Sequence, residues 1–63
     1  MELNYNTICE TIKDNINLAF KSVNQGNNIV GFEVVGNIGD NKILKKYNDY
    51  SSGIINYNKI INN

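Results

Sequence analysis

The chain has 63 residues, with six acidic and six basic side chains, one cysteine, and no histidine or proline. This length allows one small domain, residues 1–63, and the lone Cys9 excludes an internal disulfide. Without histidine and without clustered cysteines, the sequence predicts no metal and no cofactor. The core of so short a chain only about balances the entropy lost on folding, so burial against a partner would stabilise it.

The composition is biased toward asparagine and isoleucine. Fourteen asparagines, ten isoleucines and six lysines without any arginine are typical of translation from an AT-rich genome. Residues 1–4 have no basic start and no apolar run follows them, which predicts no signal peptide. The apolar runs are two or three residues long, so we expect no membrane span and a cytoplasmic protein.

Residues 5–24 carry apolar side chains at helical spacing. Thr7 with Glu10 would form a capping box, or Asn4 would cap the helix, and Gly26 would end it. We therefore predict an N-terminal amphipathic helix over about residues 5–24, with Leu18 outside its apolar stripe. The stripe consists of Tyr5, Ile8, Cys9, Ile12, Ile16, Ala19, Phe20 and Val23.

The remaining segments predict a small sheet. Residues 28–35 are β-branched and aromatic, and residues 54–61 alternate apolar and polar, so both are predicted strands. Residues 41–50 fit either a strand or a short helix. Because a hairpin is the simplest local closure, we favour an α+β fold with the helix packed on a three-stranded antiparallel sheet (αβββ). The alternative is αβαβ, with a helix at 41–50.

The stretch VVGNIGDNKILKK contains two glycines, Gly36 and Gly39, separated by two residues. It resembles the glycine loop of the KH family of single-strand nucleic-acid binders, which implies a backbone closing on a sugar-phosphate chain. The family usually has a basic residue between the glycines, where this chain has Asn37 and Ile38. We favour a plain hairpin turn and assign no family.

Charge divides the chain into two halves. Residues 1–40 have two lysines against five acidic residues, a balance of −3, and residues 41–63 have four lysines against one, a balance of +3. The basic half places three tyrosines among its lysines. This pattern supports an alternative function, weak single-stranded nucleic-acid binding through Lys42, Lys45, Lys46, Tyr47 and Tyr50.

Catalytic groups are scarce. Cys9 has no histidine to act as its base, and the acidic residues are scattered, so we expect no enzyme. The leading hypothesis is a binding protein that docks onto another protein, with self-association as one form of it. Small proteins of AT-rich bacteria and their phages are often regulators or inhibitors of host machinery, and we expect such a role. The predicted contact residues are Leu18, Asp14, Lys42, Lys45, Lys46, Tyr47 and Tyr50.

Overall fold

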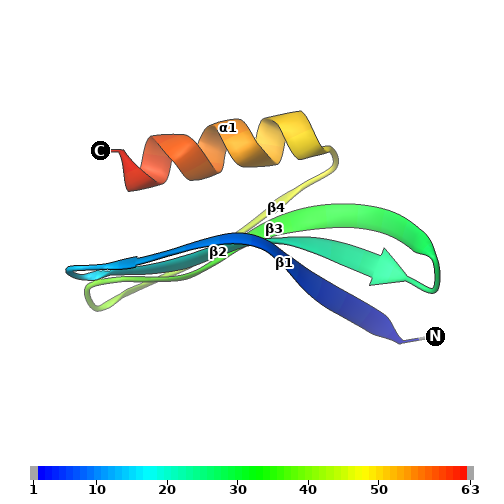
Figure 1. Cartoon of the computed structure of the whole chain (residues 1–63), viewed down its shortest axis with the longest axis horizontal. Helices are drawn as coiled ribbons and strands as arrows, with labels where there is room; N and C mark the ends of the chain where they lie inside the picture. Colours follow the sequence, from blue (N-terminus) through cyan, green and yellow to red (C-terminus); the bar gives the residue numbers. More distant parts are fainter. Residues whose placement is uncertain (1, 63) are drawn as a thin grey trace.

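The protein, a computed structural model, is described over residues 2–62. Four strands, β1 (Leu3–Lys13), β2 (Ile16–Gln25), β3 (Asn28–Ile38) and β4 (Asn41–Tyr47), precede one helix, α1 (Tyr50–Ile61). The strands form one antiparallel sheet in the order β1-β2-β3-β4, so each strand pairs with its neighbour in the chain. Figure 1 shows α1 lying along one side of this sheet.

The predicted N-terminal helix is wrong, because residues 5–24 form β1, a turn and β2. Asp14 adopts a left-handed backbone with φ of 49°, and the two-residue turn Asp14–Asn15 joins the strands. A bulge between Thr7 and Cys9 shifts the register of β1. The bulge breaks the two-residue alternation that identifies a strand, so the apolar residues fall by coincidence at helical spacing.

The predicted C-terminal strand is wrong as well, because residues 50–61 form α1. Asp49 caps this helix, with its side chain accepting a 2.8 Å hydrogen bond from the backbone N–H of Ser52. That hydrogen bond lowers the pKa of the Asp49 carboxyl. Residues 41–47 are a strand, so the αβαβ alternative with a helix at 41–50 is also wrong. A mixture of helix and antiparallel sheet remains, but the sheet has four strands instead of the predicted three, and the helix is C-terminal instead of N-terminal.

The hairpin expected around residues 36–42 is confirmed. Ile38 pairs with Asn41, and Gly39 and Asp40 form the turn between β3 and β4. Gly36 lies inside β3, paired with Leu18 on one side and Ile43 on the other. The resemblance to the KH loop requires both glycines in one loop. Here Gly36 lies in a strand and Gly39 in a turn, so this requirement is not met.

The core lies between the sheet and α1. Its fully buried side chains are Leu18 and Phe20 from β2, Val34 from β3 and Tyr57 from α1. The Phe20 ring stacks on Phe32 at a centroid distance of 5.7 Å. The hydroxyl of Tyr57 shares a 2.7 Å hydrogen bond with Thr11 Oγ1, which ties the helix to the edge strand β1. A core of four buried side chains is small, so each one carries a large share of the stability.

Gly53 lets α1 approach the sheet closely. A Cβ atom at this position would overlap Cε1 of the buried Phe20 ring and lie 2.8 Å from its Cζ atom. Replacing a helix-interior glycine by alanine normally stabilises a protein by about 0.5–1 kcal/mol. Here we expect Gly53→Ala to destabilise it by about 1–3 kcal/mol, because the added methyl overpacks the core.

Urea unfolding followed by circular dichroism measures this effect. The matched control is Asn58→Ala, at an exposed position in the same helix, which we expect to be neutral or slightly stabilising through helix propensity. A Gly53→Ala protein as stable as the wild type would show that α1 does not rest on Phe20 as described.

Candidate functional site: the uncovered face of the sheet

One face of the sheet is covered and the other is not. Within residues 2–62, α1 is the only helix, and it packs on β2, β3 and β4 from one side. Figure 1 shows no element of the chain on the opposite side of the sheet. An antiparallel sheet often has one solvated face. The side chains on such a face are normally polar, and they alternate along each strand with the apolar side chains of the buried face. The composition of the uncovered face therefore decides whether it is a binding surface.

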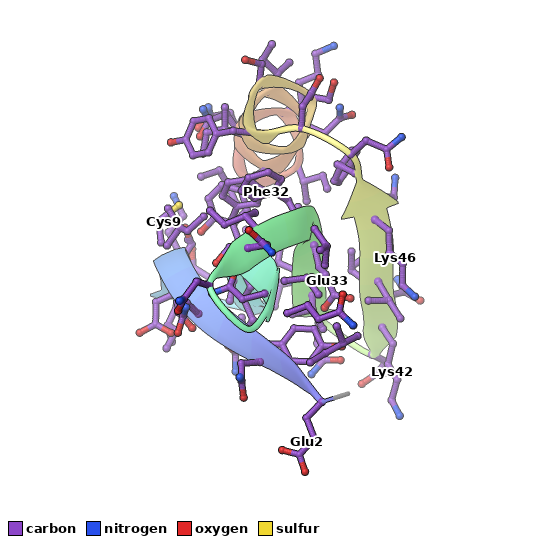
Figure 2. The ribbon with its side chains drawn as sticks, turned by 90° about the vertical axis from the view of Figure 1, so that its right-hand side faces the viewer. Glu2, Cys9, Phe32, Glu33, Lys42 and Lys46 are labelled. Atoms are coloured by element: carbon purple, nitrogen blue, oxygen red, sulfur yellow. The ribbon has the colours of Figure 1, made fainter. Side chains whose placement is uncertain are left out.

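Strand pairing arranges the middle of this face as a grid of three rows. Each row crosses the sheet from β1 to β4, and its members lie directly opposite one another on neighbouring strands. The rows are Thr7–Lys21–Glu33–Lys46, Glu10–Ala19–Val35–Leu44 and Ile12–Asn17–Asn37–Lys42. Because side chains alternate along a strand, these twelve residues share the face opposite Phe20 and Val34. Figure 2 shows the same division, with Phe32 beside α1 and Glu33 on the other side.

Several large apolar side chains are exposed on this face. Ile12 is 69% exposed and Leu44 is 61% exposed, at opposite edges of the grid, and Ala19 and Val35 lie between those edges. Toward the start of β1, Leu3 and Tyr5 are also about half exposed. Single exposed apolar residues are ordinary, but several on one face indicate an interaction surface.

The charges on the grid alternate in sign from strand to strand. Glu10 on β1 and Glu33 on β3 are acidic, whereas Lys21 on β2 and Lys42 and Lys46 on β4 are basic. Figure 2 shows Lys42 and Lys46 spaced along β4. The grid carries a net charge of +1, so its electrostatic pattern is mixed and favours a partner that is itself mixed in charge.

Two depressions mark the uncovered face. One, of about 190 Å³, lies at one end of the sheet, where its lining includes Tyr5, Glu33 and Lys46 of this face together with Phe32 and Tyr47. The other, of about 300 Å³, follows the middle of the grid between Glu10 and Asn37. Small-molecule sites measure about 300–1,000 Å³ and enclose most of their ligand. The first depression is smaller than this range, the second only reaches its lower limit, and both are open to solvent, so they fit a docking surface better than an enclosed substrate pocket.

Reactive chemistry is sparse in the part of the chain that the structure describes. Residues 2–62 contain no group of three or more histidine, cysteine or acidic side chains placed to hold a metal ion. Cys9 lies on the helix side of the sheet against the core, and burial raises the pKa of its thiol. A raised pKa keeps the thiol protonated near neutral pH, which lowers its nucleophilicity. No helix within these residues has the length and apolar character to cross a membrane.

Two predicted contact residues lie in very different places. Leu18 is only 1% exposed and belongs to the core, so its prediction as a surface contact is wrong. The error follows from the helix assignment: in β2 the side chains of Ile16, Leu18 and Phe20 alternate toward α1. Asp14 is exposed in the turn between β1 and β2, at one end of the sheet.

The predicted lysine and tyrosine strip does not form one surface. Lys42 and Lys46 belong to the uncovered face, whereas Lys45 pairs with the buried Val34 and Tyr47 pairs with Phe32 on the helix side. Tyr50 begins α1, and its ring meets the rings of Phe20 and Phe32 edge-on at 5.5 Å and 5.9 Å. The three lysines nevertheless line the same edge strand, where such charges discourage pairing with another strand.

Sequence reasoning missed most residues of the grid, including Glu10, Lys21, Glu33 and Leu44. A signal for them exists in β2, where Asn17, Ala19, Lys21 and Val23 alternate with the core residues. The helical interpretation of residues 5–24 hid this alternation. No signal in β1 identifies its uncovered side, because the bulge changes the alternation there.

A scan against protein-family models and searches of curated proteins and of solved structures found no match to this chain.

Proposed function

We propose that this protein is a non-enzymatic interaction module that docks onto another protein through the uncovered face of its sheet. The observation that carries the proposal is the asymmetry of the sheet. One face is sealed by α1, and the other exposes Leu44, Ile12 and a mixed set of charges without any covering element among residues 2–62. Exposed apolar side chains that share a face with charged ones are typical of a protein–protein interface.

The absence of reactive chemistry in the described residues gives weaker support. The raised pKa of Cys9 and the shallow depressions make a poor catalytic centre. A free cysteine fits a reducing compartment, so we place the protein in the cytoplasm. A role as regulator or inhibitor of host machinery stays a prediction from the size and composition of the chain.

A photo-crosslinking amino acid at position 44 tests the docking surface. We expect the variant carrying the crosslinker at Leu44 to capture a protein in cells of the source organism. The matched control carries the same group at Ile55, which is 52% exposed on the outer side of α1. Equal capture at both positions, or capture at Ile55 alone, would contradict the proposal.

Weak binding of single-stranded nucleic acid is a second candidate. Its support is that Lys21, Lys42 and Lys46 share the uncovered face with the exposed ring of Tyr5, which offers a base a stacking surface. Glu10 and Glu33 lie among these lysines and weaken the attraction for phosphate. Nuclease treatment before analysis separates the two candidates, since a crosslinked species that shrinks with nuclease contains nucleic acid.

A further inference from the structure

We infer that the uncovered face binds the same face of a second copy of this chain. The inference rests on the proposed function, because it names the partner of that surface. A symmetric dimer brings each residue of the grid against a residue of the same grid, so the pattern of charges must complement itself. Two orientations of the two-fold axis stack the two faces with their strands aligned, and they give opposite electrostatic results.

The favourable axis runs parallel to the strands, between β2 and β3. It places β2 of one copy over β3 of the other, and β1 over β4, while each row stays over itself. Lys21 then faces Glu33 of the second copy, and by symmetry Glu33 faces Lys21 of the second copy. Ala19 faces Val35, and Asn17 faces Asn37, whose amides can exchange hydrogen bonds.

The edges of the grid agree with this arrangement. Glu10 of β1 lies over Leu44 of the second copy, between the two basic side chains Lys42 and Lys46 of that strand. Ile12 lies over Lys42, whose aliphatic stem can cover it. Because the charges alternate in sign from strand to strand, this arrangement places unlike charges of the two copies opposite or beside one another.

The other axis lies in the same plane but runs across the strands. It stacks every strand on its own copy and exchanges the first row with the third. Glu10 would then face Glu10 of the second copy, and Lys46 would face Lys42. Like charges at an interface cost affinity, so the charge pattern selects the first arrangement.

The size of the grid sets the strength that we expect. Three rows of four strands span about 400 Å² per copy, at about 4.8 Å between strands and about 6.8 Å between rows, and a depression follows the middle of this area. Two copies would together bury about 800 Å² of this area, which is below the range of stable specific interfaces and within the range of weak, transient ones. Two twisted sheets stacked face to face cross at about 30°, which is compatible with retaining the central contacts. We therefore expect a weak, concentration-dependent dimer.

Analytical ultracentrifugation of the full chain over about 1–500 µM tests for this dimer. We expect Leu44→Asp to raise the dissociation constant at least tenfold, since it buries a carboxylate against Glu10 of the second copy. The matched control Ile55→Asp, on the outer side of α1, should leave it within about twofold.

Charge exchange in trans provides the decisive measurement. K21E and E33K alone each place like charges opposite one another in the dimer, so each variant should dissociate about tenfold more readily. Mixing the two variants restores unlike charges across the interface, and we expect a heterodimer close to wild-type strength. Repulsion within each chain is unchanged by mixing, so recovery cannot come from improved folding. Circular dichroism of each variant confirms that it is folded.

Several outcomes would overturn the inference. A wild-type chain that stays monomeric over the whole range would do so, as would a dimer insensitive to Leu44→Asp, which points to pairing through the edge strand β1. A failure to recover in the K21E and E33K mixture also contradicts it. None of these outcomes tests the proposed docking function. That function is tested separately, by comparing photo-crosslinking at position 44 with photo-crosslinking at position 55.

Discussion

Gly36→Ala should destabilise the protein by about 2–4 kcal/mol, because the backbone of β3 has no room for a side chain at this position. Gly36 has φ of 147°, a conformation that residues with a Cβ atom rarely adopt. An added Cβ atom would overlap the backbone carbonyl oxygen of Asn17 and lie 2.9 Å from Cα of Leu18. Relief requires β2 and β3 to move apart, which disrupts the pairing at the centre of the sheet.

The matched control is Gly31→Ala, on the same strand. A Cβ atom there would meet only the carbonyl oxygen of Tyr47, at an ordinary 3.4 Å, and the φ of Gly31 lies outside the positive range that L residues rarely adopt. Urea unfolding of both variants should show a large decrease in the free energy of unfolding for Gly36→Ala and a decrease of less than about 1 kcal/mol for Gly31→Ala. Equal losses at the two positions would contradict the described path of β3.

Leu18→Ala should cost about 2–5 kcal/mol of unfolding free energy, because Leu18 is one of four side chains that make up the buried core. A domain of 63 residues has a total stability of about 3–9 kcal/mol. The substitution therefore removes a large part of that stability, and the variant should be partly unfolded at 25 °C. The substitution leaves a cavity in the core cluster that Leu18 forms with Phe20, Val34 and Tyr57.

Leu44→Ala is the control, since it removes the same atoms from a side chain that is 61% exposed. We expect it to change stability by less than about 0.5 kcal/mol in the monomer. Thermal unfolding by calorimetry, at a concentration where the chain is monomeric, compares the two variants. A small effect at Leu18 together with a large one at Leu44 would mean that the two faces of the sheet are assigned in reverse.

The contrast between these leucines shows where sequence reasoning stopped. The helical spacing of residues 5–24 placed Leu18 outside the apolar stripe, whereas the alternation of Ile16, Leu18 and Phe20 in β2 places it inside. The helical period and the two-residue period of a strand both fit the apolar residues of this segment, because a bulge and a turn interrupt the strand alternation. Local pattern alone does not decide between them, because strand pairing depends on residues that are distant in the sequence.

Competition between the helical and strand periods also explains the wrong prediction for the C-terminal segment. Residues 54–61 alternate well enough for a strand, but Asp49 caps a helix, and the spacing of Ile54, Tyr57 and Ile61 suits one apolar helix face. The sheet has already been completed by four strands with a lysine-rich edge at β4, so this segment gains more by covering the core than by extending the sheet.

The amino-acid sequence by itself predicted one small domain, a strand at residues 28–35, a hairpin with its loop within residues 36–40, and a scarcity of catalytic groups. These features follow from length, composition and short-range turn chemistry. Only the tertiary structure decided that residues 5–24 form a hairpin and that Glu10, Lys21, Glu33 and Leu44 share one uncovered face. The physical reason is that the facing of a strand residue depends on register, which pairing with the neighbouring strands fixes.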